Sequence, residues 1–164
     1  MRKQAPPIDL DRIDAGILAA LQNDGRLANK ELAAKVGLAP SSCLERVKRL
    51  RTQGVLRGVH ADVAPSALGI GLEAIVAIRM RHHSLQQYRE FRTHLLSIPE
   101  VVAYYNLTGT QDFLAHVMVR NPEHLYTLLL EKLTARPEVD RIETSLVFEA
   151  VRRPTLPDLR QGAR

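Results

Sequence analysis

The sequence predicts an α+β protein, with an N-terminal winged helix-turn-helix followed by a ferredoxin-like βαββαβ domain. Three observations support this fold class. Apolar residues recur with helical spacing through the first 60 residues, and from about residue 72 they alternate with strand spacing. The motif Pro-Glu-Val, at 99–101 and again at 137–139, closes a helix-like segment and opens a strand-like one both times. Such an internal repeat is expected of a domain built from two βαβ halves.

The first of three predicted helices has a single apolar stripe. Its residues are Leu10, Ile13, Ile17, Leu18 and Leu21. Asp9 or Asp11 is expected to cap its start, and the sequence Asn-Asp-Gly at 23–25 is expected to end it. A short second helix follows from about 29 to 36, with Asn29 as its N-cap.

The third predicted helix runs from Pro40 to Gln53, and Gly54 stands where a C-terminal glycine is expected. Its inward-facing residues are predicted to be Leu44, Val47 and Leu50. A small hairpin from about 55 to 63 would complete a wing. Helix, short helix, glycine turn and helix is the order typical of a helix-turn-helix.

Positive charge is concentrated in this first part of the chain. Residues 1–60 contain 11 Lys and Arg against 6 Asp and Glu, whereas residues 61–164 contain 12 of each, so the net charge of +5 lies in the first part. Five cations fall within twelve residues that contain no acid: Arg46, Lys48, Arg49, Arg51 and Arg57. Such an excess favours a polyanionic partner, with nucleic acid first among the candidates.

The third helix is therefore predicted to lie in the major groove of double-stranded DNA. Its candidate DNA-binding residues are Ser41, Ser42, Glu45, Arg46, Lys48 and Arg49. These side chains can bond phosphates and base edges. Arg57 and His60, on the predicted wing, would contact the DNA backbone. The competing interpretation is a three-helix protein-binding domain with a basic face.

The second part of the chain predicts four strands and two helices. We expect domain boundaries at 1–60 for the helix-turn-helix, 61–70 for a linker, 71–152 for the ferredoxin-like domain and 153–164 for a loosely ordered tail. One sheet face would be covered by the two helices. The other would carry Ile75, Ala77, Val102 and Tyr104 or their alternates, which is too apolar to stay exposed, so a homodimer is expected.

Leu-Thr-Gly-Thr-Gln-Asp-Phe, at 107–113, joins two strand-like segments and predicts a hairpin turn, in which Gly109 can adopt a positive φ. The residues at 108 and 110–112 place two hydroxyls, an amide and a carboxylate on one tip. From these residues alone, a plain polar turn and a binding loop both remain open.

The sequence resembles the Lrp/AsnC (feast/famine) family of transcription regulators from about Leu10 to Arg152. The most specific stretches are LDRIDAGILAALQNDGRLANKELAAKVGLAPSSCLERVKRLRTQGVLRGVHADVAPSALG and LTGTQDF. The resemblance implies a regulator that binds DNA and dimerises through its C-terminal domain, with further assembly into tetramers or octamers. It also implies an amino acid or related metabolite as effector, held between protomers.

The resemblance implies an effector site at the hairpin turn and a nearby strand. Its residues would be Thr108, Gly109, Thr110, Gln111, Asp112 and Thr144, with Asp112 binding an amino group. The sequence departs from the family at Ala39, where a serine N-cap is common, and at Gln111, where an aromatic residue often precedes the aspartate. The second departure changes the expected shape and hydrogen bonding of the pocket.

Other classes of protein receive less support. Cys43 lies within the third helix without a neighbouring histidine, so a buried structural thiol is expected rather than a nucleophile, and no metal site, cofactor or enzymatic activity is expected. A ligand-binding module without a DNA role is the alternative function. The N-terminus has no secretory h-region and no segment reaches the length of a membrane span, so a cytoplasmic location is expected.

Overall fold

The computed structural model of the chain describes residues 9–82, 84–151, 153 and 155–160. The chain forms two compact units. The first contains residues up to 62 together with those from 151 onward, and the second contains residues 63–150. We call them the helical unit and the sheet unit.

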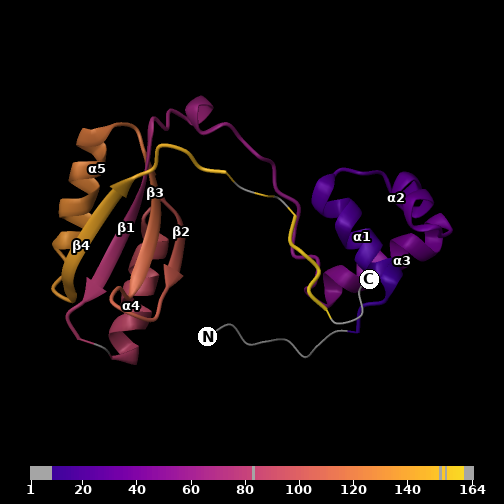
Figure 1. Cartoon of the computed structure of the whole chain (residues 1–164), viewed down its shortest axis with the longest axis horizontal. Helices are drawn as coiled ribbons and strands as arrows, with labels where there is room; N and C mark the ends of the chain where they lie inside the picture. The colour runs from indigo at the N-terminus through magenta and orange to yellow at the C-terminus, as the bar shows by residue number, and fades with distance from the viewer. Residues whose placement is uncertain (1–8, 83, 152, 154, 161–164) are drawn as a thin grey trace. The chain divides into compact units, whose positions relative to one another are not determined.

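The helical unit consists of α1 (Arg12–Asn23), α2 (Asn29–Val36) and α3 (Pro40–Thr52), as the apolar spacing predicts (Figure 1). Asp11 caps α1 through a capping box: its Oδ1 accepts from the Asp14 N–H at 2.8 Å, while Oδ2 of Asp14 accepts from the Asp11 N–H at 3.3 Å. This confirms Asp11 and not Asp9 as the N-cap.

Two local expectations for the helical unit are wrong. Ala28, not Asn29, is the N-cap of α2, and the Asn29 amide instead donates to the Pro40 carbonyl at 2.8 Å. Leu44 is 43% exposed, whereas Cys43 is fully buried. The inward stripe of α3 therefore runs through 43, 47 and 50, because a helix rotates by about 100° per residue and one position changes the face. The buried core of the unit consists of Ile17, Leu32, Ala33, Cys43, Val47 and Leu50.

The predicted wing hairpin does not form, and residues 57–64 have no regular secondary structure. The N–H groups of Val55 and Leu56 both donate to the carbonyl of Leu50, at 2.9 and 3.0 Å. This contact ties the start of the segment to the end of α3 instead of to a strand ladder. The following residues are exposed and have no sheet to pair with.

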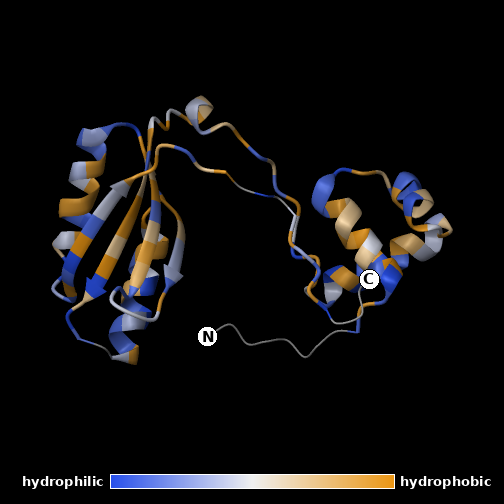
Figure 2. Cartoon of the chain, viewed as in Figure 1, coloured by the Kyte–Doolittle hydropathy of each residue, from blue (hydrophilic) through white to orange (hydrophobic). Residues whose placement is uncertain are grey.

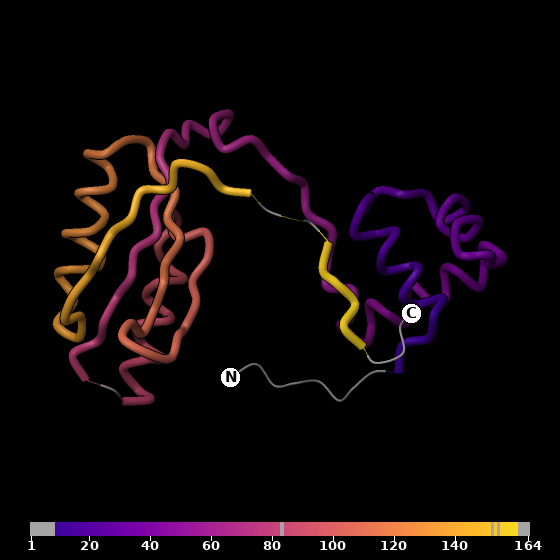
Figure 3. Tube along the Cα trace, viewed as in Figure 1, coloured from indigo at the N-terminus to yellow at the C-terminus, as the bar shows by residue number. Residues whose placement is uncertain are grey.

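The described part of the tail is more ordered than expected. The Leu156 N–H donates to the side-chain oxygen of Gln22 at 2.7 Å, and the Arg160 guanidinium donates to the Leu10 carbonyl. Figure 3 shows the yellow trace of residues 155–160 that makes these contacts. Residues 155–160 therefore belong to the helical unit, although the sheet unit precedes them in sequence.

The sheet unit has the predicted βαββαβ order. Its elements are η1 (Pro65–Leu68), β1 (Leu72–Met80), α4 (Leu85–Ser97), β2 (Val101–Asn106), β3 (Phe113–Val119), α5 (Pro122–Leu128), a π-helical turn η2 (Leu129–Thr134) and β4 (Val139–Leu146). The antiparallel sheet has the order β2-β3-β1-β4, so the two βαβ halves interleave (Figure 1).

Helices α4 and α5 cover one face of this sheet. The core between them combines alternate residues of β1 and β3 with Phe91 and Leu95 from α4 and Leu125 and Leu128 from α5. Figure 2 shows hydrophobic residues along these two central strands. Burial of a continuous apolar layer is the main favourable contribution to the stability of such a unit.

The opposite, open face of the sheet is partly exposed and mixes apolar residues such as Ile75 and Ala77 with charged ones such as Arg79 and Glu143, and one residue predicted for it differs. A bulge between Val101 and Ala103 shifts the register of β2, so Tyr104 packs toward the helices and its hydroxyl accepts from Arg92 Nε at 2.6 Å. Tyr105, which is 57% exposed, takes its place on the open face. It lies in one row across the sheet with Leu114, Ala77 and Glu143.

Candidate functional site

The first candidate site is the exposed face of α3. Ser42, Glu45, Arg46 and Arg49 line a hollow of about 240 Å³. The helix buries Cys43, Val47 and Leu50 on its other side, so the polar residues are held on a rigid support. Pro40 at the start of the helix and Gly54, with φ of 71°, after its end fix its length.

Two arginines of this face are anchored by carboxylates of α1 and its cap. Arg46 Nη1 contacts Asp11 Oδ2 at 2.5 Å and Asp14 Oδ1 at 3.0 Å, and Arg49 Nη2 bonds Asp14 Oδ2. The Asp14 side chain is 1% exposed, whereas that of Asp11 is 51% exposed. A hydrogen bond from the Asp14 backbone, followed by the Arg46 contact, lowers the pKa of Asp11.

The other predicted DNA-binding residues occupy two different settings. Ser41 and Lys48 lie exposed on α3, and no carboxylate of a described residue pairs with Lys48. Arg57 and His60 lie on the exposed irregular segment that follows α3 and contribute nothing to the hollow. Sequence reasoning did not find Asp11 and Asp14 as partners of the arginines. The only sequence signal was the predicted capping of α1 by Asp9 or Asp11, and nothing in the sequence analysis pointed to Asp14.

The second candidate site is the turn between β2 and β3. Thr108, Gly109 and Thr110 are exposed, and Gly109 has φ of 115°, a conformation that glycine adopts without steric cost. The Leu107 N–H closes the turn by donating to the Asp112 carbonyl at 2.9 Å. The side-chain oxygen of Gln111 is buried and has no hydrogen-bond donor within the described residues.

Asp112 points into the sheet unit instead of toward solvent. Its carboxylate accepts from the Met80 N–H at 2.7 Å and from the Tyr88 hydroxyl, and the residue is only 7% exposed. Burial, followed by the hydrogen bond to Asp112, raises the pKa of Tyr88 to about 12. The carboxylate therefore fastens the turn to β1 and α4. The sequence gives no indication of this polar contact of Tyr88.

Thr144 is not brought to the turn within one chain. It lies on β4 opposite Val76, and β1 separates β4 from β3 in the sheet. Neighbouring strands are about 4.8 Å apart, so β3 and β4 are about 10 Å apart. The five turn residues form one group, and the sixth predicted effector residue stands outside it.

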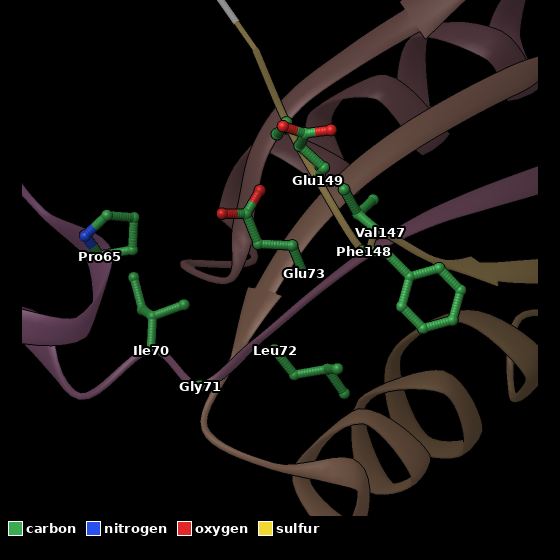
Figure 4. Close-up of a pocket in the computed structure, with 9 residues that line it drawn as sticks. Pro65, Ile70, Gly71, Leu72, Glu73, Val147, Phe148 and Glu149 are labelled. Carbon is green, nitrogen blue, oxygen red and sulfur yellow. The ribbon is translucent and has the colours of Figure 1, made fainter.

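A second hollow, of about 210 Å³, lies where β1 begins and β4 ends (Figure 4). Figure 4 shows the carboxylates of Glu73 and Glu149 on one side of the chain and Phe148 pointing the other way. Glu73 bonds His116 Nε2 at 2.9 Å. Within the described residues, no three His, Cys, Asp or Glu side chains gather as metal ligands. No helix in the described part of the chain is long and apolar enough to cross a membrane.

Comparison with known proteins matches both units. Residues 10–51 match the AsnC-type helix-turn-helix domain, and residues 73–157 match the Lrp/AsnC ligand binding domain. The HTH-type transcriptional regulator AldR of Mycolicibacterium smegmatis is 42% identical over 144 residues, which cover 88% of this chain and 84% of that protein. The leucine-responsive regulatory protein of Escherichia coli is 37% identical over 150 residues, covering 92% of each.

A solved structure agrees with both matches. A transcriptional regulator from Neisseria meningitidis, in complex with L-Met, aligns with a TM-score of 0.85 at 31% identity. The alignment covers 91% of this chain and 97% of that one. The helix-turn-helix and the α+β unit are therefore shared along almost the whole chain.

Proposed function

The chain belongs to the Lrp/AsnC family of transcriptional regulators, and we propose that it reads double-stranded DNA through the exposed face of α3. The observation that carries this assignment is the joint display of Ser42, Glu45, Arg46 and Arg49 around one hollow. Hydroxyl, carboxylate and guanidinium groups on one helix face can address both phosphates and base edges.

Ser41, Lys48, Arg57 and His60 would supply the surrounding backbone contacts. All four are exposed, and Lys48 and Arg57 carry charge that no carboxylate of a described residue offsets. Such cations release counterions from DNA when they bind phosphates, which makes the affinity depend on salt.

A salt titration with a matched variant tests this assignment. A duplex selected by the protein from a randomised pool is bound at a series of salt concentrations. We expect Lys48→Ala to weaken binding and to reduce the slope of log affinity against log salt by about 1. Arg89→Ala, which removes an exposed cation of α4, should change neither quantity. Failure to enrich any duplex would favour a ligand-binding module without a DNA role.

For the effector, we propose an amino acid or a related metabolite bound at the β2–β3 turn, with residues 108–112 on one side and Thr144 supplied by a neighbouring protomer. Gln111 offers the clearest recognition group. Its buried side-chain oxygen lacks a donor within the described residues, and an ammonium group could supply one. Asp112 would act by shaping the turn, because its carboxylate already accepts from Met80 and Tyr88.

A thermal-shift screen against the twenty amino acids identifies the effector class, because a ligand that binds the folded state raises the apparent melting temperature. We expect Gln111→Met, which keeps the size but removes the acceptor, to abolish the shift. Thr108→Val should reduce it. Thr144→Val tests separately whether Thr144 of a neighbouring protomer contributes to effector binding. An unchanged shift in all three variants would place the ligand elsewhere.

We also propose that the open face of the sheet forms a homodimer, which can assemble further into tetramers or octamers. Tyr105 is 57% exposed there and lies beside Leu114. In sedimentation equilibrium, Tyr105→Asp should shift the protein toward the monomer. Tyr126→Asp, at an aromatic of α5 that is 66% exposed, is the matched control and should leave the mass unchanged. Equal behaviour of the two variants would contradict this interface.

A further inference from the structure

We propose that Asp14 of α1 positions the guanidinium groups of Arg46 and Arg49 for base reading, and that it thereby sets the ratio of specific to non-specific DNA affinity. The inference rests on the proposed DNA-reading role of α3. It concerns a residue that stands on another helix, outside the DNA-reading face.

The geometry places Asp14 between the two arginines. Its Oδ1 accepts from Arg46 and its Oδ2 accepts from Arg49, so one carboxylate holds both guanidinium groups. Asp14 is 1% exposed, and the capping box with Asp11 fixes its own position in the first turn of α1. A buried, hydrogen-bonded carboxylate is a rigid anchor for long side chains that would otherwise lose rotamer entropy on binding.

The anchoring contacts leave donors available for DNA. Arg46 uses Nη1 for both carboxylates, and Arg49 uses Nη2 for Asp14. Each guanidinium has five N–H donors in a planar fork, so each retains donors on its other nitrogens. Their side chains are 27% and 45% exposed. A bidentate contact with a guanine edge requires two donors, and holding the plane of the fork in place favours that contact.

The same contacts remove charge from the face. Two carboxylates, Asp11 and Asp14, offset Arg46 and Arg49. Of the five cations between residues 46 and 57, the other three, Lys48, Arg51 and Arg57, have no carboxylate partner among the described residues. Non-specific affinity for DNA follows the uncompensated positive charge. Loss of the Asp14 charge should therefore weaken the specific contact and strengthen the non-specific one.

The experiment compares two duplexes, one selected by the wild-type protein from a randomised pool and one of scrambled sequence with the same composition. Asp14→Asn keeps an oxygen that can accept from the Asp11 N–H, removes the charge and replaces the second acceptor oxygen with an NH2 donor. We expect the ratio of selected to scrambled affinity to fall about tenfold, in line with the discrimination given by one bidentate base contact. The salt slope on the scrambled duplex should increase by about 0.9.

Asp24→Asn is the matched control, because Asp24 is an exposed aspartate of the same unit whose carboxylate accepts from the Arg26 N–H and from no other described residue. It should leave the ratio and the slope unchanged. A purely structural role of Asp14 would lower the folded fraction and reduce both affinities equally, so the ratio separates positioning from folding. An unchanged ratio in Asp14→Asn would overturn the inference.

A second variant keeps the test decisive if Asp14→Asn does not fold. Arg49→Lys preserves the charge but cannot form the planar fork. We expect a lower ratio with an unchanged salt slope, and an unchanged ratio would again overturn the inference. Wild-type protein that binds neither duplex would instead reject the DNA-reading role of α3 itself.

Discussion

Each unit contains one buried aspartate whose two oxygens are both engaged, but the donors differ in kind. Asp14, in the helical unit, accepts from two arginines that are partly exposed. Asp112, in the sheet unit, accepts from a backbone N–H and a phenol. The first carboxylate therefore orients charged side chains at the surface, whereas the second joins three parts of its own unit: the turn, β1 and α4.

This difference changes what each carboxylate can do for function. The Met80 N–H and the Tyr88 hydroxyl are held in place by β1 and α4, so their contacts with Asp112 make the turn rigid. Arg46 and Arg49 can keep their contacts with Asp14 while they bind DNA, because each guanidinium retains N–H donors that the two aspartates do not use. Burial alone does not separate the two cases, since both residues are less than 10% exposed. The kind of donor separates them, because arginine side chains bond Asp14, whereas a backbone N–H and a phenol bond Asp112.

The largest expected effect is that of Asp112→Ala. The Met80 N–H and the Tyr88 hydroxyl would lose their acceptor, and hydrogen bonds to a charged group contribute about 1.5–3 kcal/mol each. We expect the free energy of unfolding to fall by about 3 kcal/mol, measured by urea denaturation. Asp112→Asn, which keeps one acceptor, should lose about half as much. If Asp112→Ala abolished effector binding at full stability, the carboxylate would be a ligand contact.

Tyr88→Phe should have a smaller effect, with a distinct dependence on pH. Burial and the hydrogen bond to Asp112 raise the pKa of Tyr88 from 10.0 to about 12. A phenol with a raised pKa in the folded state contributes stability that is fully present below pH 10 and is lost as the pH rises toward 12. Wild-type protein should therefore lose stability over this interval faster than Tyr88→Phe, measured by thermal unfolding at fixed salt. Parallel curves would show that this phenol does not ionise differently on folding.

The order of the elements could be predicted from the sequence because it depends on the periodicity of apolar residues. In β1 this periodicity is seen in the burial of every second residue: Ala74, Val76, Ile78 and Met80. The predictions that failed depend on local features of the backbone. The wing hairpin is absent because two N–H groups turn back to Leu50, and Tyr104 changes face because of one bulge. Neither the hydrogen bonds to Leu50 nor the bulge in β2 can be recognised from the spacing of apolar residues.

The candidate sites show the same limit. Residue type and helical spacing were sufficient to place Ser42, Glu45, Arg46 and Arg49 on one face. They could not show that Arg46 and Arg49 contact an aspartate 32 and 35 residues earlier in the chain, or that Asp112 points inward. Such contacts depend on how α1 packs on α3 and how the turn packs on β1, which a single sequence does not specify.

The smallest expected effect is that of Asp11→Asn, and it tests whether burial decides the importance of the two aspartates that Arg46 contacts. The side chain of Asp11 is 51% exposed, so water and salt screen its attraction to Arg46. Backbone and Arg46 hydrogen bonds lower its pKa, so its contribution is present above its ordinary value of 3.8 and is lost as the pH falls below that value. Thermal unfolding should therefore distinguish Asp11→Asn from wild type slightly at pH 7 and not at all at strongly acidic pH. A loss at pH 7 as large as that of Asp14→Asn would show that Arg46 depends on its exposed partner as much as on the buried one, and the assignment of positioning to Asp14 would then have to include Asp11.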